Sequence, residues 1–166
     1  MRNNQGKSTV IWQYNCGPPL TVEKGVLMAT VAASLIATSA AITFLVGVLH
    51  LVYTFHGSKL LPRDAELHSR MQQVNPVITR QTTMWKAWIG FNASHSVGLI
   101  LYGAVYAYLA LIHPDFLFES VFLLVLGLIT LLGYVVLAKQ YFFRAPFRLV
   151  LLSSVLYILA LVGQFV

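Results

Sequence analysis

Four long apolar runs, separated by polar connections, dominate the pattern of this chain. They cover about 26–53, 84–112, 116–138 and 147–166. An α-helix needs about 20 apolar residues to cross the hydrocarbon core of a bilayer, and each run is long enough. The pattern therefore predicts an all-α fold, a four-helix transmembrane bundle.

The polar segments predict a tail and a surface element. Residues 1–23 are polar and mixed, so we expect an N-terminal tail followed by a four-span membrane domain over 24–166. In the first connection, residues 62–74 have three apolar side chains at helical spacing. These would lie on one side of a helix, opposite the charged residues. The apolar three are Leu67, Met71 and Val74. This pattern is typical of a short amphipathic helix lying on the membrane surface. Asn75 and Pro76 are suited to cap and start the second span's helix ahead of the membrane.

Composition agrees with a membrane protein and gives an orientation. Apolar residues make up 58% of the chain and charged residues only 10%, which is far below the charge of a soluble domain. The basic residues of the first and third connections are Lys59, Arg63, Arg70, Arg80, Lys86, Lys139, Arg144 and Arg148. Only Arg2, Lys7 and Lys24 belong to the other side. The positive-inside rule then places both connections in the cytoplasm and both termini outside.

The chain has a net charge of +6, but no nucleic-acid recognition motif accompanies its basic residues. Because the basic residues flank apolar runs, membrane lipids with anionic head groups are the expected partners, and nucleic acid is not. The single cysteine, Cys16, excludes an internal disulfide and a cysteine-rich metal site.

The first span carries a seam of mostly small residues at alternating spacings of four and three. Its members are Ala29, Ala33, Ile36, Ala40, Thr43, Gly47, His50 and Thr54. Small residues let two helices approach closely in a membrane, so we expect this seam to pack against a neighbouring helix. His50 shares the seam and is therefore expected to face protein.

The second span has two faces. An α-helix turns by about 100° per residue, and this geometry gives the span two sets of residues. One is a polar and aromatic stripe, and the other is a separate row of small residues. The stripe contains Asn92, His95, Ser96, Leu99, Tyr102, Gly103 and Tyr106, and the row contains Ala87, Gly90, Ser94 and Gly98. The row predicts close packing on the first span at Gly90 and Gly98. Lipid offers no hydrogen bonds, so the polar groups of the stripe must face protein, trapped water or a ligand. Leu101 is expected to face lipid, and so is Leu99, although Leu99 lies close to the polar residues of the stripe.

The two spans together predict one polar cluster in the cytoplasmic third of the bundle. His50 and His95 could approach each other there, with Asn92 as the expected hydrogen-bond partner of His95. The candidate ligand-binding residues are His50, Asn92, Ser94, His95, Ser96, Tyr102 and Tyr106. Three interpretations stay open: polar groups that hold the bundle together, a ligand or cofactor site, or a site of catalysis or proton transfer.

Specific chemistries find little support in the residue types. Two facing histidines could hold a haem between helices, so haem is an alternative, but no cofactor is predicted. His, Asn and Ser without a nearby carboxylate supply too few ligands for a metal site. No catalytic triad, phosphate loop or paired carboxylates are found, so no enzymatic reaction is predicted.

The run Gly90-Phe91-Asn92-Ala93-Ser94-His95-Ser96-Val97-Gly98 resembles the Gly-Phe-Asn-x-Ser-His-x-x-Gly run of a group of small bacterial four-span membrane proteins whose function is uncharacterised. The resemblance implies a four-span protein of the bacterial inner membrane and carries over no activity or ligand. We expect a bundle that binds a lipid-like or other hydrophobic ligand in a polar cleft between spans one and two. The alternatives are an accessory subunit of a larger membrane complex, docked through spans three and four, and a lipid-modifying enzyme with His95 as general base.

Overall fold

The computed structural model describes residues 20–165, and the side chains of 24–164. Most of the predicted tail, including Cys16, lies outside the described residues. Within them the chain is helical and has no strand. The helices are α1 (Leu20–Phe55), α2 (Ala65–Gln73), α3 (Met84–Ile112), α4 (Pro114–Glu119), α5 (Val121–Tyr141) and α6 (Arg144–Phe165). In this part of the chain four helices, α1, α3, α5 and α6, are long and apolar enough to cross a membrane, which confirms the all-α four-helix prediction.

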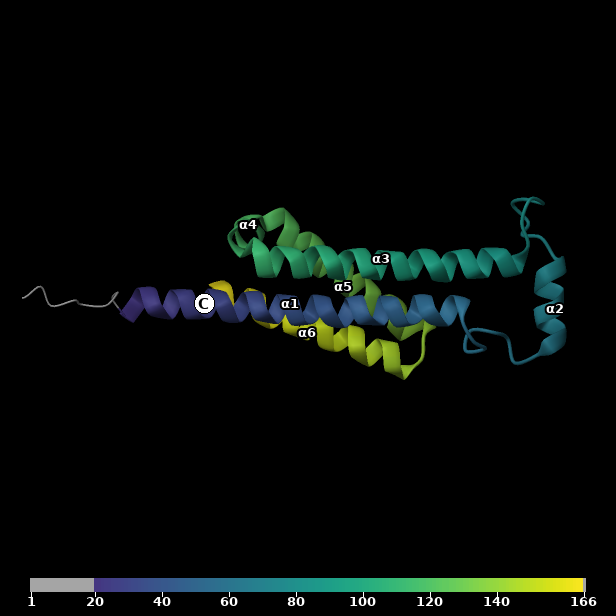
Figure 1. Cartoon of the computed structure of the whole chain (residues 1–166), viewed down its shortest axis with the longest axis horizontal. Coiled ribbons are helices and arrows are strands. Elements are labelled where there is room, and N and C mark those ends of the chain that lie inside the picture. Colours follow the sequence, from purple (N-terminus) through teal and green to yellow (C-terminus); the bar gives the residue numbers. More distant parts are fainter. Residues whose placement is uncertain (1–19, 166) are drawn as a thin grey trace, which may run out of the picture.

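Consecutive long helices run antiparallel, so the connections gather at two ends (Figure 1). One end, which we call the α2 end, carries the α1–α3 connection and the α5–α6 turn. The short helix α4 and the described start of α1 lie at the opposite end. Helix α2 lies across the bundle axis, as expected for a helix that follows a membrane surface.

Local capping explains where the helices start. Helix α2 is shorter than the predicted 62–74 because Asp64 accepts hydrogen bonds from the backbone N–H of Glu66 and Leu67 and so begins the helix. Thr83 caps α3. The predicted role of Asn75 as its cap is therefore wrong: the Asn75 amide instead donates to the Thr82 carbonyl at 2.6 Å and closes the loop before α3.

The third span begins later than expected. The predicted helix over 116–138 is broken at Ser120, whose extended backbone separates α4 from α5. The Ser120 hydroxyl accepts from the Leu123 N–H, so the serine acts as the N-cap of α5. The fourth span begins earlier than expected, at Arg144, because Pro146 fits within the first turn of a helix.

Helix α1 is the centre of the bundle and packs along α3 and α6. Its seam is turned inward: Ile36, Ala40, Thr43 and Gly47 are buried, and Ala29 and His50 are half-buried. The remaining seam members, Ala33 and Thr54, are buried as well.

Glycine allows α1 and α3 to approach closely. A Cβ atom at Gly103 of α3 would lie 2.6 Å from the Ala40 carbonyl oxygen, and one at Gly47 of α1 would lie 2.8 Å from the Leu99 Cβ. The predicted contacts with α1 at Gly90 and Gly98 are wrong: a Cβ at Gly90 would meet nothing within 4 Å, and one at Gly98 would meet the Tyr134 hydroxyl of α5 at 3.1 Å. Leu99 is buried rather than near lipid, since it packs against Gly47.

A hydrogen-bonded hydroxyl cluster joins α1 to α6. The Ser39 and Ser153 hydroxyls lie 2.8 Å apart, and the Thr43 and Ser153 hydroxyls 2.9 Å apart. The Ser153 hydroxyl also lies 2.9 Å from the Ser39 carbonyl oxygen. All three residues are completely buried. Lipid cannot form hydrogen bonds with these hydroxyls, so they are satisfied only when α1 and α6 bring them together. The cluster therefore fixes the register of the two helices.

Three tyrosines connect α5 to the rest of the bundle. The hydroxyls of Tyr102 and Tyr106 in α3 donate to the carbonyls of Gly127 and Leu123, and that of Tyr157 in α6 donates to Leu124. Helices α3 and α5 make little close backbone contact, so these rings fill the space between them. Tyr102 and Tyr106 are therefore core residues and not part of the predicted ligand site.

Candidate functional site

A cavity of about 940 Å³ lies at the α2 end of the bundle. All four long helices contribute to it, through the last turns of α1 and α5 and the first turns of α3 and α6. Its apolar wall includes Val46, Leu49, Leu99, Ala138, Leu149 and Val150. Its aromatic residues are Tyr53, Trp88, Tyr134, Tyr141, Phe142 and Phe143. The cavity is thus near the upper end of the size range of small-molecule sites, roughly 300–1,000 Å³, and like them it is mainly apolar.

The segment after α1 folds back to form one border of this cavity. Gly57 has a φ of +89°, a left-handed conformation that favours glycine, and it turns the chain after α1 ends. The Trp88 indole then donates to the Leu60 carbonyl at 3.3 Å. Lys59, held in this segment, has its ammonium 3.9 Å from the centre of the Tyr53 ring. Lys59, Leu60 and Tyr53 all line the cavity.

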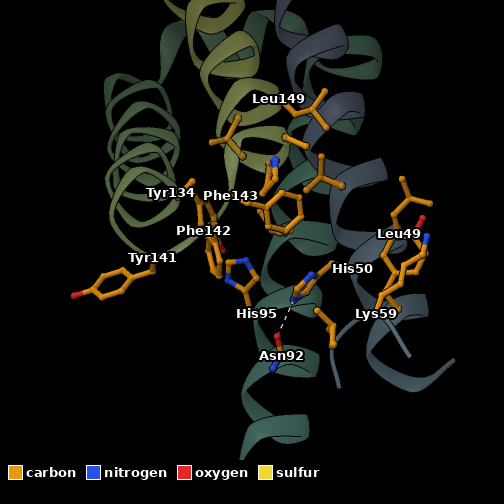
Figure 2. A pocket seen from close by; sticks show the side chains of 18 of the residues that line it. Leu49, His50, Lys59, Asn92, His95, Tyr134, Tyr141, Phe142, Phe143 and Leu149 are labelled. Carbon is orange, nitrogen blue, oxygen red and sulfur yellow. Dashed lines mark hydrogen bonds between the residues drawn. The ribbon is translucent and has the colours of Figure 1, made fainter. Parts of the chain in front are cut away.

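A hydrogen-bond chain fixes the state of His50. The Asn92 Nδ2 donates to the Trp88 carbonyl at 2.8 Å, which leaves its Oδ1 as an acceptor for His50 Nε2 at 3.1 Å (Figure 2). In a neutral ring, the network therefore places the proton on Nε2 and leaves Nδ1 as an acceptor. The predicted pairing of Asn92 with His95 is wrong: Asn92 bonds across to α1 instead of within α3.

His95 faces the cavity without a hydrogen bond. The His95 ring is half-buried and forms no hydrogen bond with another residue in the described part of the chain. The ring instead contacts aromatic rings, with centroid distances of 5.4 Å to His50, 5.4 Å to Tyr134 and 5.8 Å to Phe142. Figure 2 shows His95 between His50 on one side and Tyr134 and Phe142 on the other. A neutral imidazole there offers one donor and one acceptor to whatever occupies the cavity.

The structure brings together only part of the predicted cluster. His50, Asn92 and His95 line the cavity. Ser94 is exposed on the outer side of α3 and bonds the Phe91 carbonyl, and buried Ser96 bonds the Asn92 carbonyl within the helix. Thr54 likewise bonds the His50 carbonyl of its own helix. These three hydroxyls satisfy backbone acceptors and do not reach either imidazole.

Several lining residues were not among the sequence candidates. Tyr134, Phe142 and Phe143 come from the end of α5 and the turn after it, and Lys59 and Leu60 come from the segment after α1. The available signal was the run Tyr141-Phe142-Phe143 beside basic residues, which resembles an ordinary membrane-interface belt. Hydropathy could not indicate that these residues border a cavity.

His50 and His95 are not arranged as two facing axial ligands. The two imidazoles touch edge to face, and Asn92 occupies Nε2 of His50, so a porphyrin plane has no room between them without rearrangement. Among the described residues no group of three His, Cys, Asp or Glu side chains is placed to hold a metal ion. At this site no hydroxyl bonds His50 or His95 as an activated nucleophile would, and the hydroxyl–imidazole bond between Tyr108 and His113 lies at the opposite end of the bundle.

Comparison of the chain with known protein families, with curated proteins and with solved structures finds no match. The resemblance of 90–98 to small bacterial four-span proteins therefore stays a prediction.

Proposed function

We propose that this protein is a membrane-embedded bundle that binds a lipid-like or other hydrophobic ligand in the cavity at its α2 end. The ligand's apolar part lies along the aliphatic and aromatic wall, and its polar group lies beside His50 and His95. The site involves all four long helices, and is thus wider than a cleft between the first two spans. By the positive-inside rule this end faces the cytoplasm, and the resemblance noted above favours a bacterial inner membrane.

One observation carries this proposal: an imidazole without a hydrogen bond faces a mainly apolar cavity. A polar group inside a membrane protein is costly unless it is paired, and intramembrane ionisable residues are candidates for function. If His95 only held the bundle together, it would be expected to bond a neighbouring helix, as Ser39 and Ser153 do. A ligand with a polar group supplies the partner that the described residues do not.

The test is the retention of a ligand by the purified protein. Organic extracts of wild-type, His95→Leu and Ser94→Leu protein are compared by mass spectrometry, and the melting temperature of each is measured in the same detergent. Ser94 is the matched control because it is polar, lies one residue away and is exposed outside the cavity. We expect a stoichiometric lipid-like species in wild-type and Ser94→Leu extracts, and its loss from His95→Leu without unfolding. Equal retention by all three proteins, or no such species in wild type, would contradict the proposal.

A further inference from the structure

The cavity has a fixed positive charge and no negative one. Lys59 is the one Lys or Arg among the residues that line it, and no Asp or Glu lines it. Charges interact more strongly beside a low-dielectric wall than in water, so this imbalance affects what binds there. A cationic head group would meet Lys59 without a counter-ion, whereas an anionic one would pair with it.

The carboxylates of the α2 end do not compensate for this charge. Asp64 accepts two backbone N–H groups as the cap of α2, and Glu66 lies in the exposed first turn of that helix. Asp115 and Glu119 belong to α4, at the opposite end. The exposed Lys139, Arg144 and Arg148 at the α5–α6 turn, by contrast, are close in sequence to cavity residues on these two helices and increase the positive potential.

Lys59 is held at the cavity and keeps its hydrogen-bonding capacity. Its ammonium rests on the Tyr53 ring, a contact that uses none of its three N–H groups for a hydrogen bond. His95 and Tyr134 also line the cavity, the first with an imidazole and the second with a phenol whose hydroxyl lies near Gly98 of α3. Neither has a hydrogen-bond partner among the residues that the structure describes. The site therefore offers an ammonium and at least two further donors.

We infer, on the basis of the proposed binding function, that the ligand is an amphiphile with an anionic head group, a carboxylate or a phosphate monoester. Lys59 pairs with the head group, and His95 and Tyr134 are further donors among the residues that line the cavity. Such charge-assisted hydrogen bonds are stronger than neutral ones. A cavity of about 940 Å³ accommodates one such molecule with a single alkyl chain.

The experiment uses amphiphiles that share one brominated alkyl chain and differ only in the head group: carboxylate, phosphate, alcohol and amine. Bromine quenches indole fluorescence at contact, and Trp88 lines the cavity. The full chain with Trp12→Phe and Trp85→Phe, reconstituted in neutral lipid, thus reports binding through Trp88 alone. We expect the carboxylate and phosphate to bind about tenfold tighter than the alcohol, and the amine to bind weakest.

A matched pair of charge removals locates the effect. Lys59→Gln should abolish most of the preference for an anionic head group, while Lys86→Gln, an equal change at an exposed site outside the cavity, should leave it unchanged. An alcohol that binds as tightly as the carboxylate, or a preference that both variants reduce equally, would overturn the anionic inference and leave the binding function intact. Failure of every chain-bearing probe to quench Trp88 would overturn both. If inorganic phosphate displaces the alkyl phosphate and the alcohol does not bind, the site is one for free anions. That result would overturn the inference that the ligand is an amphiphile.

Discussion

At the scale of single residues, His50 and His95 show how one residue type takes two roles in one bundle. Both rings are half-buried and only 5.4 Å apart between centroids, yet His50 has a fixed partner in Asn92 and His95 has none among the described residues. The difference arises because the Asn92 side chain is turned toward α1 by its bond to the Trp88 carbonyl. His50 is thereby a positioned wall residue, whereas His95 lines the same cavity without a hydrogen bond to a described residue.

The close approach of tyrosine rings to α5 gives a prediction at a single glycine. A Cβ at Gly127 would lie 2.7 Å from the Tyr106 Cε1, too close for a real contact. Gly127→Ala should therefore lower the stability of the bundle by about 1–3 kcal/mol, the usual cost of overpacking. Gly133→Ala in the same helix meets nothing within 4 Å and should leave stability unchanged or raise it. Thermal melting in detergent measures both, and equal effects would contradict the packing of Tyr106 against α5.

Spacing alone predicted which residues of α1 would turn inward but not which partners they would have. A seam at alternating spacings of four and three follows from helix geometry, and Ile36, Ala40 and Thr43 lie on it. The identity of a partner depends on the relative rotation and depth of two helices, which spacing does not encode. Asn92 was therefore assigned to the wrong histidine, and Lys59 could not be recognised as a cavity residue.

At the scale of helices, the hydroxyl cluster between α1 and α6 predicts a measurable interaction. Ser153→Ala removes its bonds to both Ser39 and Thr43 and should reduce stability by about 1–2 kcal/mol, the magnitude found for hydrogen bonds between membrane helices in model peptides. Ser154→Ala is the control, because Ser154 is equally buried but bonds the Val150 carbonyl of its own helix. A detergent or urea titration compares them. If Ser154→Ala proves as harmful as Ser153→Ala, the bonds between helices contribute nothing specific.

Hydropathy and length determine whether a segment spans the membrane, so the four spans could be predicted. They do not determine which helices pack against each other, so the helix pairs could not be predicted. The row through Gly90 and Ser94 has the spacing of a packing face, yet this part of α3 is exposed. Close approach occurs at Gly103, which the pattern placed in the polar stripe. Between α3 and α5 the contact is made by the side chains of Tyr102 and Tyr106, which a hydropathy pattern treats as ordinary interior residues.

At the scale of the whole molecule, the distribution of charge predicts its orientation. Ser69→Cys in α2 and Asp115→Cys in α4 place a thiol at opposite ends of the bundle, in a background in which Cys16 is replaced by serine. Because the basic residues gather at the α2 end, a membrane-impermeant maleimide should label Cys at position 115 in intact cells and Cys at position 69 only after permeabilisation. The reverse pattern would place the cavity on the outer side.

The contact between α1 and α6 also affects the order in which the helices can pack during synthesis and membrane insertion. Ribosomes release α1 first and α6 last, and helices α1 and α3 can pair as soon as both have entered the bilayer. During that interval Ser39 has no partner from α6, although its hydroxyl can turn to a carbonyl of its own helix, as Ser34 does. Helix α5 also waits, since its main helical neighbour is α6. The wall that α6 contributes to the cavity, through Leu149 and Val150, is therefore absent until the last helix has entered the bilayer.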